Sequence, residues 1–388
     1  MAWKRFLSFL NQNRVLASIF CIGLTLRLWG TYPGYPLIHP DEPTIQTSSI
    51  RMVFESDFRP QAYYYGQLLP LLYAVTYIFF FIPLSFVFTL PFHPEFSTSG
   101  LTSYFAHIAA GFPLHKIEFW AVHYWARYDS AILSSFVVVL SYSLGKKLFG
   151  NRVGLIAAFL TAVNYRHVSS SRMALADAPA SFFAILAILV FFNLYKSPKL
   201  KNYLLAGVAL GLAFSVKYFI YILPSFFIAH LFASLSRKKR KLFFRLTSVV
   251  FSFRLVLVFF IAGAVFISLN PYFILAREEA MEQWAANSAR YGLKLSWGVL
   301  TSNNLSYYSL YYLYHYGLGP ILSFLTIVGV VWGFLKHPRN SLFVLSVALP
   351  YLYVFLVVSG TGLVRNYSAI IPLFLFFPAI LLSDLIGF

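Results

Sequence analysis

The sequence predicts an all-α membrane protein with many spanning helices. Of the 388 residues, 59% are hydrophobic and only 11% are charged, and the mean hydropathy is +0.72. Soluble domains carry about 25% charged residues, so this composition excludes an ordinary soluble enzyme. It also excludes a disordered chain, which combines low hydrophobicity with high charge. Cys21 is the single cysteine, so no disulfide forms within the chain.

Apolar stretches of about 20 residues predict the spanning helices. We expect about ten or eleven spans, and ten stretches are clear candidates: 15–33, 119–145, 152–168, 176–195, 202–217, 219–235, 248–269, 317–335, 341–358 and 366–386. An eleventh stretch, 64–90, is equally apolar but contains Pro70 and Pro83.

Short basic clusters set the expected orientation, because they favour the cytoplasmic side. An even number of crossings separates these clusters only if 64–90 does not cross the membrane. This stretch is then a helix lying at the outer face, or a re-entrant hairpin broken at Pro83. The alternative is a true crossing with another hidden at 101–114. The basic run 237–241 is expected to bind anionic lipid rather than nucleic acid.

This topology predicts one transmembrane domain over 1–388, with a cytoplasmic N-terminus and two long outer loops, 34–118 and 270–316. We expect the plasma membrane of a prokaryote. Eleven of the twelve acids then fall at the outer face or its membrane edge, and only Asp384 falls inside. An acid in the bilayer is costly and functional by default. The asymmetry therefore indicates that the outer face carries the chemistry.

The first candidate motif is the segment 38–43, Ile-His-Pro-Asp-Glu-Pro, directly after the first apolar helix. Adjacent side chains in an extended or turn segment point in different directions. One of Asp41 and Glu42 can therefore act as a base while the other holds a ligand or the loop, and the flanking prolines fix the backbone. The alternative is a solvated acidic turn.

Several other charged residues are predicted at the same outer depth, at or near helix ends. Several cations at the same depth in the membrane favour the binding of an anionic headgroup or a phosphate-type leaving group. The alternatives are that Lys217 snorkels to the interface, that Arg127 pairs with Asp129, and that the arginines meet lipid phosphates. These residues are Arg127, Asp129, Arg172, Asp177, Lys217 with Tyr218, and Arg365 with Asn366 and Tyr367.

Two further groups are weaker candidates. A solvated helical face is predicted for Glu278, Glu279 and Glu282. The tyrosines of 307–314 predict an interfacial belt, and tyrosine rings can also stack on sugars. The outer histidines show no recognisable metal spacing, so no cofactor is assigned and a divalent metal is left open. They are His39, His93, His107, His115 and His123.

The order of these motifs resembles the GT-C membrane glycosyltransferases. Within them it is most similar to the superfamily of protein O-mannosyltransferases and aminoarabinose transferases. The resemblance rests on Leu-Arg-Leu-Trp-Gly at 26–30, His-Pro-Asp-Glu at 39–42, the Gly-Lys-Lys-Leu-Phe-Gly-Asn-Arg turn at 145–152, Ser171-Arg172 with Asp177, and Arg365-Asn366-Tyr367. The family's usual His-Pro-Pro is replaced here by Tyr63-Tyr64-Tyr65-Gly66.

The resemblance implies an inverting hexosyl- or pentosyltransferase that moves a sugar from a polyprenyl-phosphate donor to a hydroxyl of a protein, lipid or glycan. It implies membrane-lying helices in the first outer loop. It also implies Asp41 as base, Glu42 as the residue that positions the acceptor or the loop, and Arg127, Lys217 and Arg365 as phosphate ligands. The donor or sugar site would comprise Arg172, Asp177, His39 and Tyr218.

Two other functions are compatible with these residues. Outer acids with membrane cations also suit a transporter or flippase of a lipid-linked sugar, although such proteins usually show repeated halves and acids at the membrane midplane. A non-catalytic scaffold is the third possibility, and it predicts that substitutions at Asp41, Lys217 or Arg365 are silent.

Overall fold

The computed structural model describes residues 14–31, 39–89, 119–235, 252–292, 305–358 and 364–387, together with positions 100 and 103. All regular elements in these ranges are helical. The larger ones are α2 (Arg14–Leu28), α3 (Glu42–Phe54), α4 (Leu68–Thr76), α5 (Ile82–Thr89), α7 (Phe119–Phe149), α8 (Asn151–Val163), α10 (Asp177–Lys196), α11 (Leu200–Lys217), α12 (Leu223–Leu235), α14 (Phe253–Leu269), α16 (Arg277–Gly292), α17 (Leu305–Tyr312), α18 (Pro320–Lys336), α19 (Pro338–Tyr353) and α21 (Phe376–Ile386).

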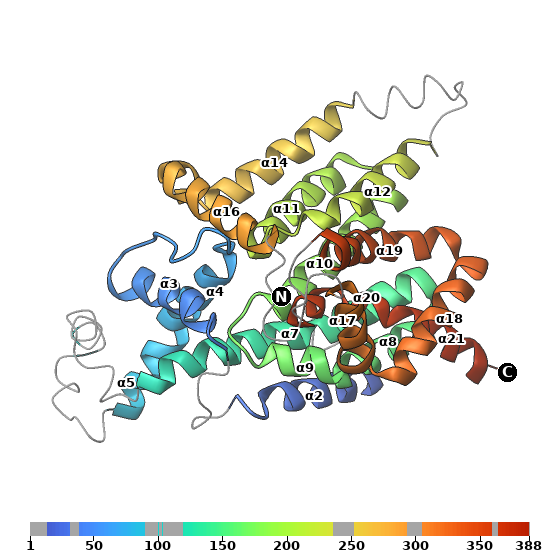
Figure 1. Ribbon diagram of the computed structural model, residues 1–388, viewed down its shortest axis with the longest axis horizontal. Coiled ribbons are helices and arrows are strands. Elements are labelled where there is room, and N and C mark those ends of the chain that lie inside the picture. Colours follow the sequence, from blue (N-terminus) through green and yellow to red (C-terminus); the bar gives the residue numbers. More distant parts are fainter. Residues whose placement is uncertain are drawn as a thin grey trace.

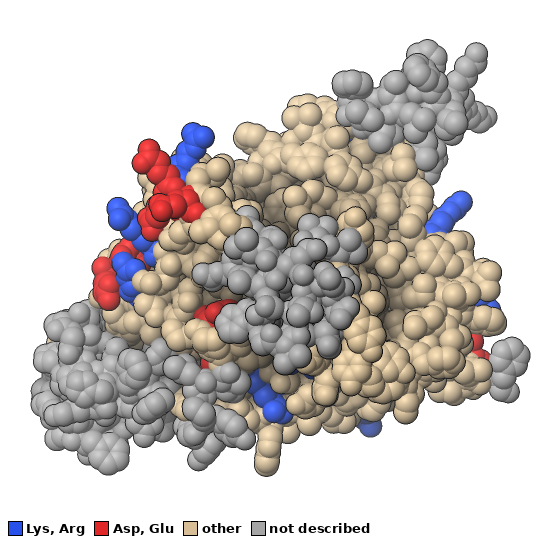
Figure 2. Space-filling view, viewed as in Figure 1, with Lys and Arg blue, Asp and Glu red and all other residues tan. Residues whose placement is uncertain are grey.

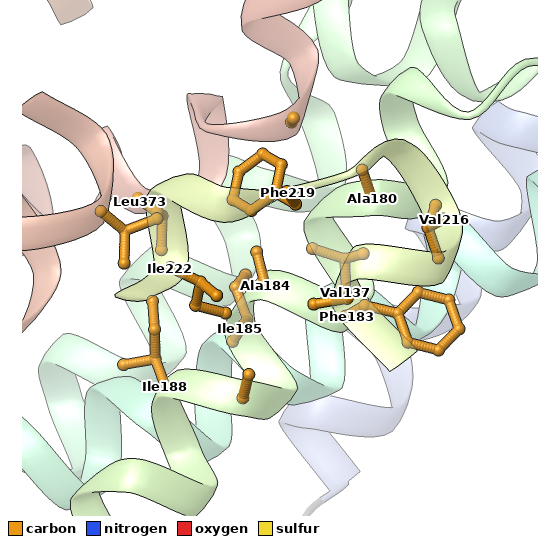
Figure 3. Packing of buried hydrophobic residues seen from close by; sticks show 14 of the residues in the cluster. Val137, Ala180, Phe183, Ala184, Ile185, Ile188, Val216, Phe219, Ile222 and Leu373 are labelled. Atoms are coloured by element: carbon orange, nitrogen blue, oxygen red, sulfur yellow. The ribbon is translucent and has the colours of Figure 1, made fainter. Parts of the chain in front are cut away.

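Helix α10 occupies the centre of the bundle, where it contacts α7, α11 and α12 (Figure 1). It is apolar on all sides, which is typical of a helix that is buried all round. Its Ala180 and Ala184 leave room for Phe219, which follows α11, and its Ile188 lies near Ile222 (Figure 3). The central helix therefore fixes the positions of the helix ends around it, including its own start at Asp177.

Fewer helices than expected are long enough to span a membrane on their own. Four of the described helices are long enough and apolar enough to cross a membrane: Leu68–Val87, Tyr124–Phe149, Asp177–Lys196 and Pro338–Leu356. A fifth candidate is the pair Ser309–Leu318 and Pro320–Lys336, bent by 103° at its junction. The other predicted stretches are helical in their described parts but shorter. The all-α membrane fold is confirmed, and several of the expected spans are helices shorter than a full crossing in the described residues.

The stretch 64–90 is not a hairpin broken at Pro83. It forms one continuous helical run through α4, the π-helix η1 (Tyr77–Phe81) and α5. The N–H of Ile82 bonds to the carbonyl of Tyr77, so the wider turn of η1 comes directly before the proline. The helix lies at one end of the bundle beside α3 (Figure 1). The suggested second crossing at 101–114 lies outside the described residues, apart from position 103.

Charged side chains gather at this same end, over α3 and α16, while most of the visible face carries other residues (Figure 2). At the other end of the bundle, Asp384 of α21 accepts a hydrogen bond from Trp332 and pairs with Lys336 at 3.0 Å. The predicted separation of Asp384 from the other acids is therefore seen among the described residues.

The segment 61–67 is the last part of the connection between α3 and α4, and it docks on helices that are distant in the sequence. A Cβ atom on Gly66 would lie 2.1 Å from the carbonyl oxygen of Ser215, so only glycine allows this backbone approach to α11. The N–H of Gln67 donates to Asn270 at 2.9 Å. These contacts fix the preceding residue Tyr65, which belongs to the candidate site.

Candidate active site

Asp41 lies immediately before α3, and its carboxylate is held on one side only. Its Oδ2 accepts hydrogen bonds from the Arg365 guanidinium at 2.7 Å and from the Tyr65 hydroxyl at 3.1 Å. The other oxygen, Oδ1, has no hydrogen-bond partner among the described residues. The side chain is 35% exposed, against 12% for Arg365. Asp41 therefore presents an oriented and accessible carboxylate oxygen.

Glu42 points in the opposite direction, into the protein, as expected for an adjacent side chain. It is fully buried and accepts two hydrogen bonds from Arg127, at 2.9 and 2.7 Å, and one from the N–H of Ala174 at 2.9 Å. Arg127 is only 1% exposed. The alternative that Arg127 pairs with Asp129 is wrong, because Asp129 bonds to Thr76 instead. A phosphate contact by Arg127 finds no support in this geometry.

A second ion pair forms where α10 begins and α11 ends. Lys217, the last residue of α11, pairs with Asp177, the first residue of α10, and donates to Asn366 at 3.1 Å. A carboxylate at a helix N-terminus interacts favourably with the helix dipole. Because Asn366 follows Arg365, this contact brings Lys217 and Arg365 to the same place.

His39 joins the two parts of the site. Its Nδ1 accepts a hydrogen bond from the N–H of Asp41 at 3.1 Å, and the guanidinium of Arg365 donates to the imidazole, whose Nε2 is its nearer atom. Burial and the charge of Arg365 lower the pKa of His39 and outweigh the opposite effect of Asp41. The imidazole is therefore neutral near pH 7, and it orients both Asp41 and Arg365.

The other two predicted site residues make contacts that support the helices. Arg172 donates to the carbonyl of Leu26 at 2.7 Å, near the end of α2. Tyr218 adopts a left-handed backbone at φ 47°, and its hydroxyl donates to the carbonyl of Tyr63. Its ring meets that of Trp284 edge-on at 5.1 Å. Their assignment to a donor or sugar site stays a prediction.

Tyr63 connects the two predicted outer loops. Its N–H donates to Gln283 at 3.0 Å, and its hydroxyl donates to Glu279 at 3.2 Å. Burial and the nearby Glu279 carboxylate raise the pKa of Tyr63 to about 12, so the hydroxyl keeps its proton. Glu278 and Glu282 are exposed, as predicted, whereas the exposed Glu279 also fastens α16 to the 61–67 segment.

Three residues near the site had no assigned role from sequence. Tyr65 and Asn366 stand inside quoted motifs, but only the fold shows that they contact Asp41 and Lys217. Arg166 lies in α9 (Tyr165–Ser171), close enough to Asp177 and Arg365 to interact electrostatically. It lies outside every motif of the sequence, and only the contact between Ser170 and Ser368 brings it near Arg365.

A cavity of about 210 Å³ adjoins this site. Tyr65 both lines the cavity and donates to Asp41, and Tyr63, Tyr218, Asn270 and Phe273 form other parts of the wall. Six of its fourteen lining residues are aromatic, and two, Gln67 and Asn270, carry amides. The cavity therefore offers space for a substrate group next to the carboxylate.

No three His, Cys, Asp or Glu side chains converge to hold a metal ion in the described part of the chain. The side chains of His93, His107, His115 and His123 lie outside the described residues. The possibility of a divalent metal is therefore not tested.

Comparison with known proteins supports the family expected from the motifs. Residues 105–266 match the family described as dolichyl-phosphate-mannose-protein mannosyltransferase. No curated protein sequence matches the chain significantly. Among solved structures, the chain is similar to ArnT from Cupriavidus metallidurans bound to undecaprenyl phosphate, with a TM-score of 0.56 and 13% identity, covering 96% of this chain and 60% of that one.

A second solved structure has the same architecture. It is the archaeal oligosaccharyltransferase AglB from Archaeoglobus fulgidus in complex with an inhibitory peptide and a dolichol-phosphate, with a TM-score of 0.57 and 15% identity. The match covers 96% of this chain and 50% of that one, so the chain spans about half to three fifths of the length of these proteins. The chain has the GT-C fold, and the family match over residues 105–266 supports its resemblance to the mannosyltransferases.

Proposed function

We propose that this chain, a GT-C fold protein, is an inverting glycosyltransferase that uses a polyprenyl-phosphate-linked sugar at the outer face of the membrane. The acceptor is a hydroxyl of a protein, lipid or glycan. One observation carries the proposal: the partly exposed Asp41 carboxylate pairs with Arg365, and Lys217 donates to the adjacent residue Asn366. The undecaprenyl phosphate and dolichol-phosphate bound to the two similar structures support a lipid phosphate as the donor group.

The reaction needs one base and several cations. The acceptor oxygen attacks C1 of the sugar, the bond between C1 and the phosphate oxygen breaks, and the acceptor proton passes to a base. The lipid phosphate leaves as an anion and needs no proton, but cations stabilise its growing charge. A glycosidase, by contrast, needs a pair of carboxylates. Asp41 with Arg365 and Lys217 forms a sufficient set.

Arg365 couples donor binding to the base. In the structure it donates to Asp41 Oδ2, and a phosphate that binds nearby shares this guanidinium. The phosphate and the Asp41 carboxylate then share one counter-charge. Asp177 holds Lys217 in place, and the buried pair of Glu42 and Arg127 supports the start of α3.

Replacing Asp41 by Asn tests the assignment of the base. We expect transfer in detergent with polyprenyl-phosphate sugars to fall by about 10²–10⁴-fold, the usual contribution of a general base, while donor binding persists. Asp57→Asn is a matched control in the same loop, because Asp57 pairs with Arg51 away from the site. Transfer by Asp41→Asn at the wild-type rate would overturn the assignment. A transporter would show no transfer in detergent, where no compartments exist.

A further inference from the structure

Arg166 has no counter-charge among the ion pairs of the site. Lys217 pairs with Asp177, and Arg365 pairs with Asp41. Arg166 forms no ion pair among the described residues, and its buried Nε has no hydrogen-bond partner there. A buried donor without a partner is costly. A partly buried guanidinium in this state is suited to receive an anionic ligand.

The fold holds Arg166 next to Arg365. The hydroxyls of Ser170 in α9 and Ser368 in η6 (Val364–Ala369) are 2.6 Å apart and join the two helices. Arg166 lies four residues before Ser170, and Arg365 lies three residues before Ser368. These spacings place each arginine one turn from the serine contact, on the same face of its helix.

Helix α9 itself is fixed in place. Asn164 accepts a hydrogen bond from the N–H of His167 and donates to the carbonyl of Gly317 at 3.1 Å. The pair of guanidinium groups is thus a feature of the packed helices rather than of two independent surface side chains. Like charges repel at this range, so a bound anion between or beside them is favourable.

We propose that Arg166 is a third ligand of the lipid phosphate and supplies the net charge of the site. Three cations, Arg166, Lys217 and Arg365, face two carboxylates, Asp41 and Asp177, and His39 is neutral, which leaves a net charge of +1. A sugar phosphodiester carries one negative charge and matches it. The charge at the phosphate grows when the C1–O bond breaks, and a guanidinium binds phosphate oxygens in a bidentate manner. This inference rests on the proposed function.

Binding of farnesyl phosphate and of farnesol to the purified full-length protein tests Arg166. We expect Arg166→Gln to weaken farnesyl phosphate binding by about 10- to 100-fold, the loss of one charge-assisted hydrogen-bond group, and to leave farnesol binding unchanged. Farnesyl phosphate binding by the Arg166→Gln variant should also depend less steeply on the salt concentration. Arg59→Gln is the matched control, because Arg59 is an exposed cation near Tyr63 and outside the cluster.

The possible results separate this inference from the proposed function. Farnesyl phosphate binding by Arg166→Gln within twofold of wild type overturns the inference, and so does an equal loss of farnesol binding, which indicates a structural role. A wild-type protein that does not prefer farnesyl phosphate over farnesol contradicts the proposed function itself. If Arg166→Gln does not fold, Arg166→Lys keeps the charge without the planar group, and unchanged phosphate affinity in that variant overturns bidentate binding.

A bilayer phospholipid is another source of phosphate. Competition with phosphatidylglycerol in mixed micelles distinguishes the two. If Arg166→Gln weakens only the competition by phosphatidylglycerol and not the binding of farnesyl phosphate, the residue contacts lipid headgroups and the inference is wrong.

Discussion

The buried pair of Glu42 and Arg127 allows a quantitative test of what the adjacent carboxylates do. Replacing Glu42 by Gln removes the negative charge but keeps an oxygen that can accept from Ala174. Arg127 then remains buried without the carboxylate with which it forms an ion pair. The structure thus predicts a large loss of stability when one carboxylate oxygen is replaced by an amide nitrogen.

The expected magnitude follows from burial and geometry. Both side chains are almost completely buried, and the guanidinium binds the carboxylate through two hydrogen bonds. Removing one partner of such a pair costs about 3–5 kcal/mol, because the remaining charge loses its compensation. Removing both charges, in Glu42→Gln with Arg127→Met, should cost less than the single change. A double-mutant cycle therefore gives a large coupling energy.

The free energy of unfolding in mixed micelles measures this effect. Glu55→Gln is the matched control on α3, because Glu55 is 61% exposed in its pair with Arg51 and an exposed pair contributes about 0–1 kcal/mol. A Glu42→Gln variant within 1 kcal/mol of wild type would refute the reasoning. Farnesyl phosphate binding by the double variant should persist, since Arg127 does not contact the phosphate in the proposed site.

Two further predictions concern the residues around Asp41. Gly66→Ala should prevent the 61–67 segment from docking, since the new Cβ would lie 2.1 Å from the Ser215 carbonyl oxygen. We expect a lower unfolding temperature and slower glycosyl transfer, because Tyr65 is then no longer held against Asp41. Wild-type values of both quantities contradict this prediction. The lowered pKa of His39 means that the unfolded chain binds a proton more readily. The wild type should therefore lose stability relative to His39→Gln as the pH falls below 6.5 toward the pKa of His39 in the folded protein. A difference in the free energy of unfolding between the two proteins that stays constant from pH 8 to pH 5 excludes this.

Features that depend on local pattern were predictable from the sequence. Asp177 begins α10 because a carboxylate is favourable in the first turn, and the apolar residues after it have the length of a span. Lys217 ends α11 directly before the left-handed Tyr218. The divergence of Asp41 and Glu42 follows from backbone geometry alone.

Features that depend on distant partners were not predictable. Asp129 is two residues from Arg127, yet Arg127 pairs with Glu42, which only the packing of α3 against the buried turn at Ala174 brings near. Pro83 predicts a break, but the π-helix before it lets the helix continue. Arg166 lacks any motif, and its proximity to Arg365 follows from the contact between α9 and η6.

The link through Tyr63 also constrains how the protein is made. The partner of its N–H, Gln283, is 220 residues further along the chain, and Arg365 follows Asp41 by 324 residues. At a synthesis rate of about 5–20 residues per second, the first loop waits roughly 10–45 seconds for α16. Its aromatic residues therefore emerge well before their packing partners exist. The Asp41 carboxylate acquires its partner cation only after residue 365 has been synthesised.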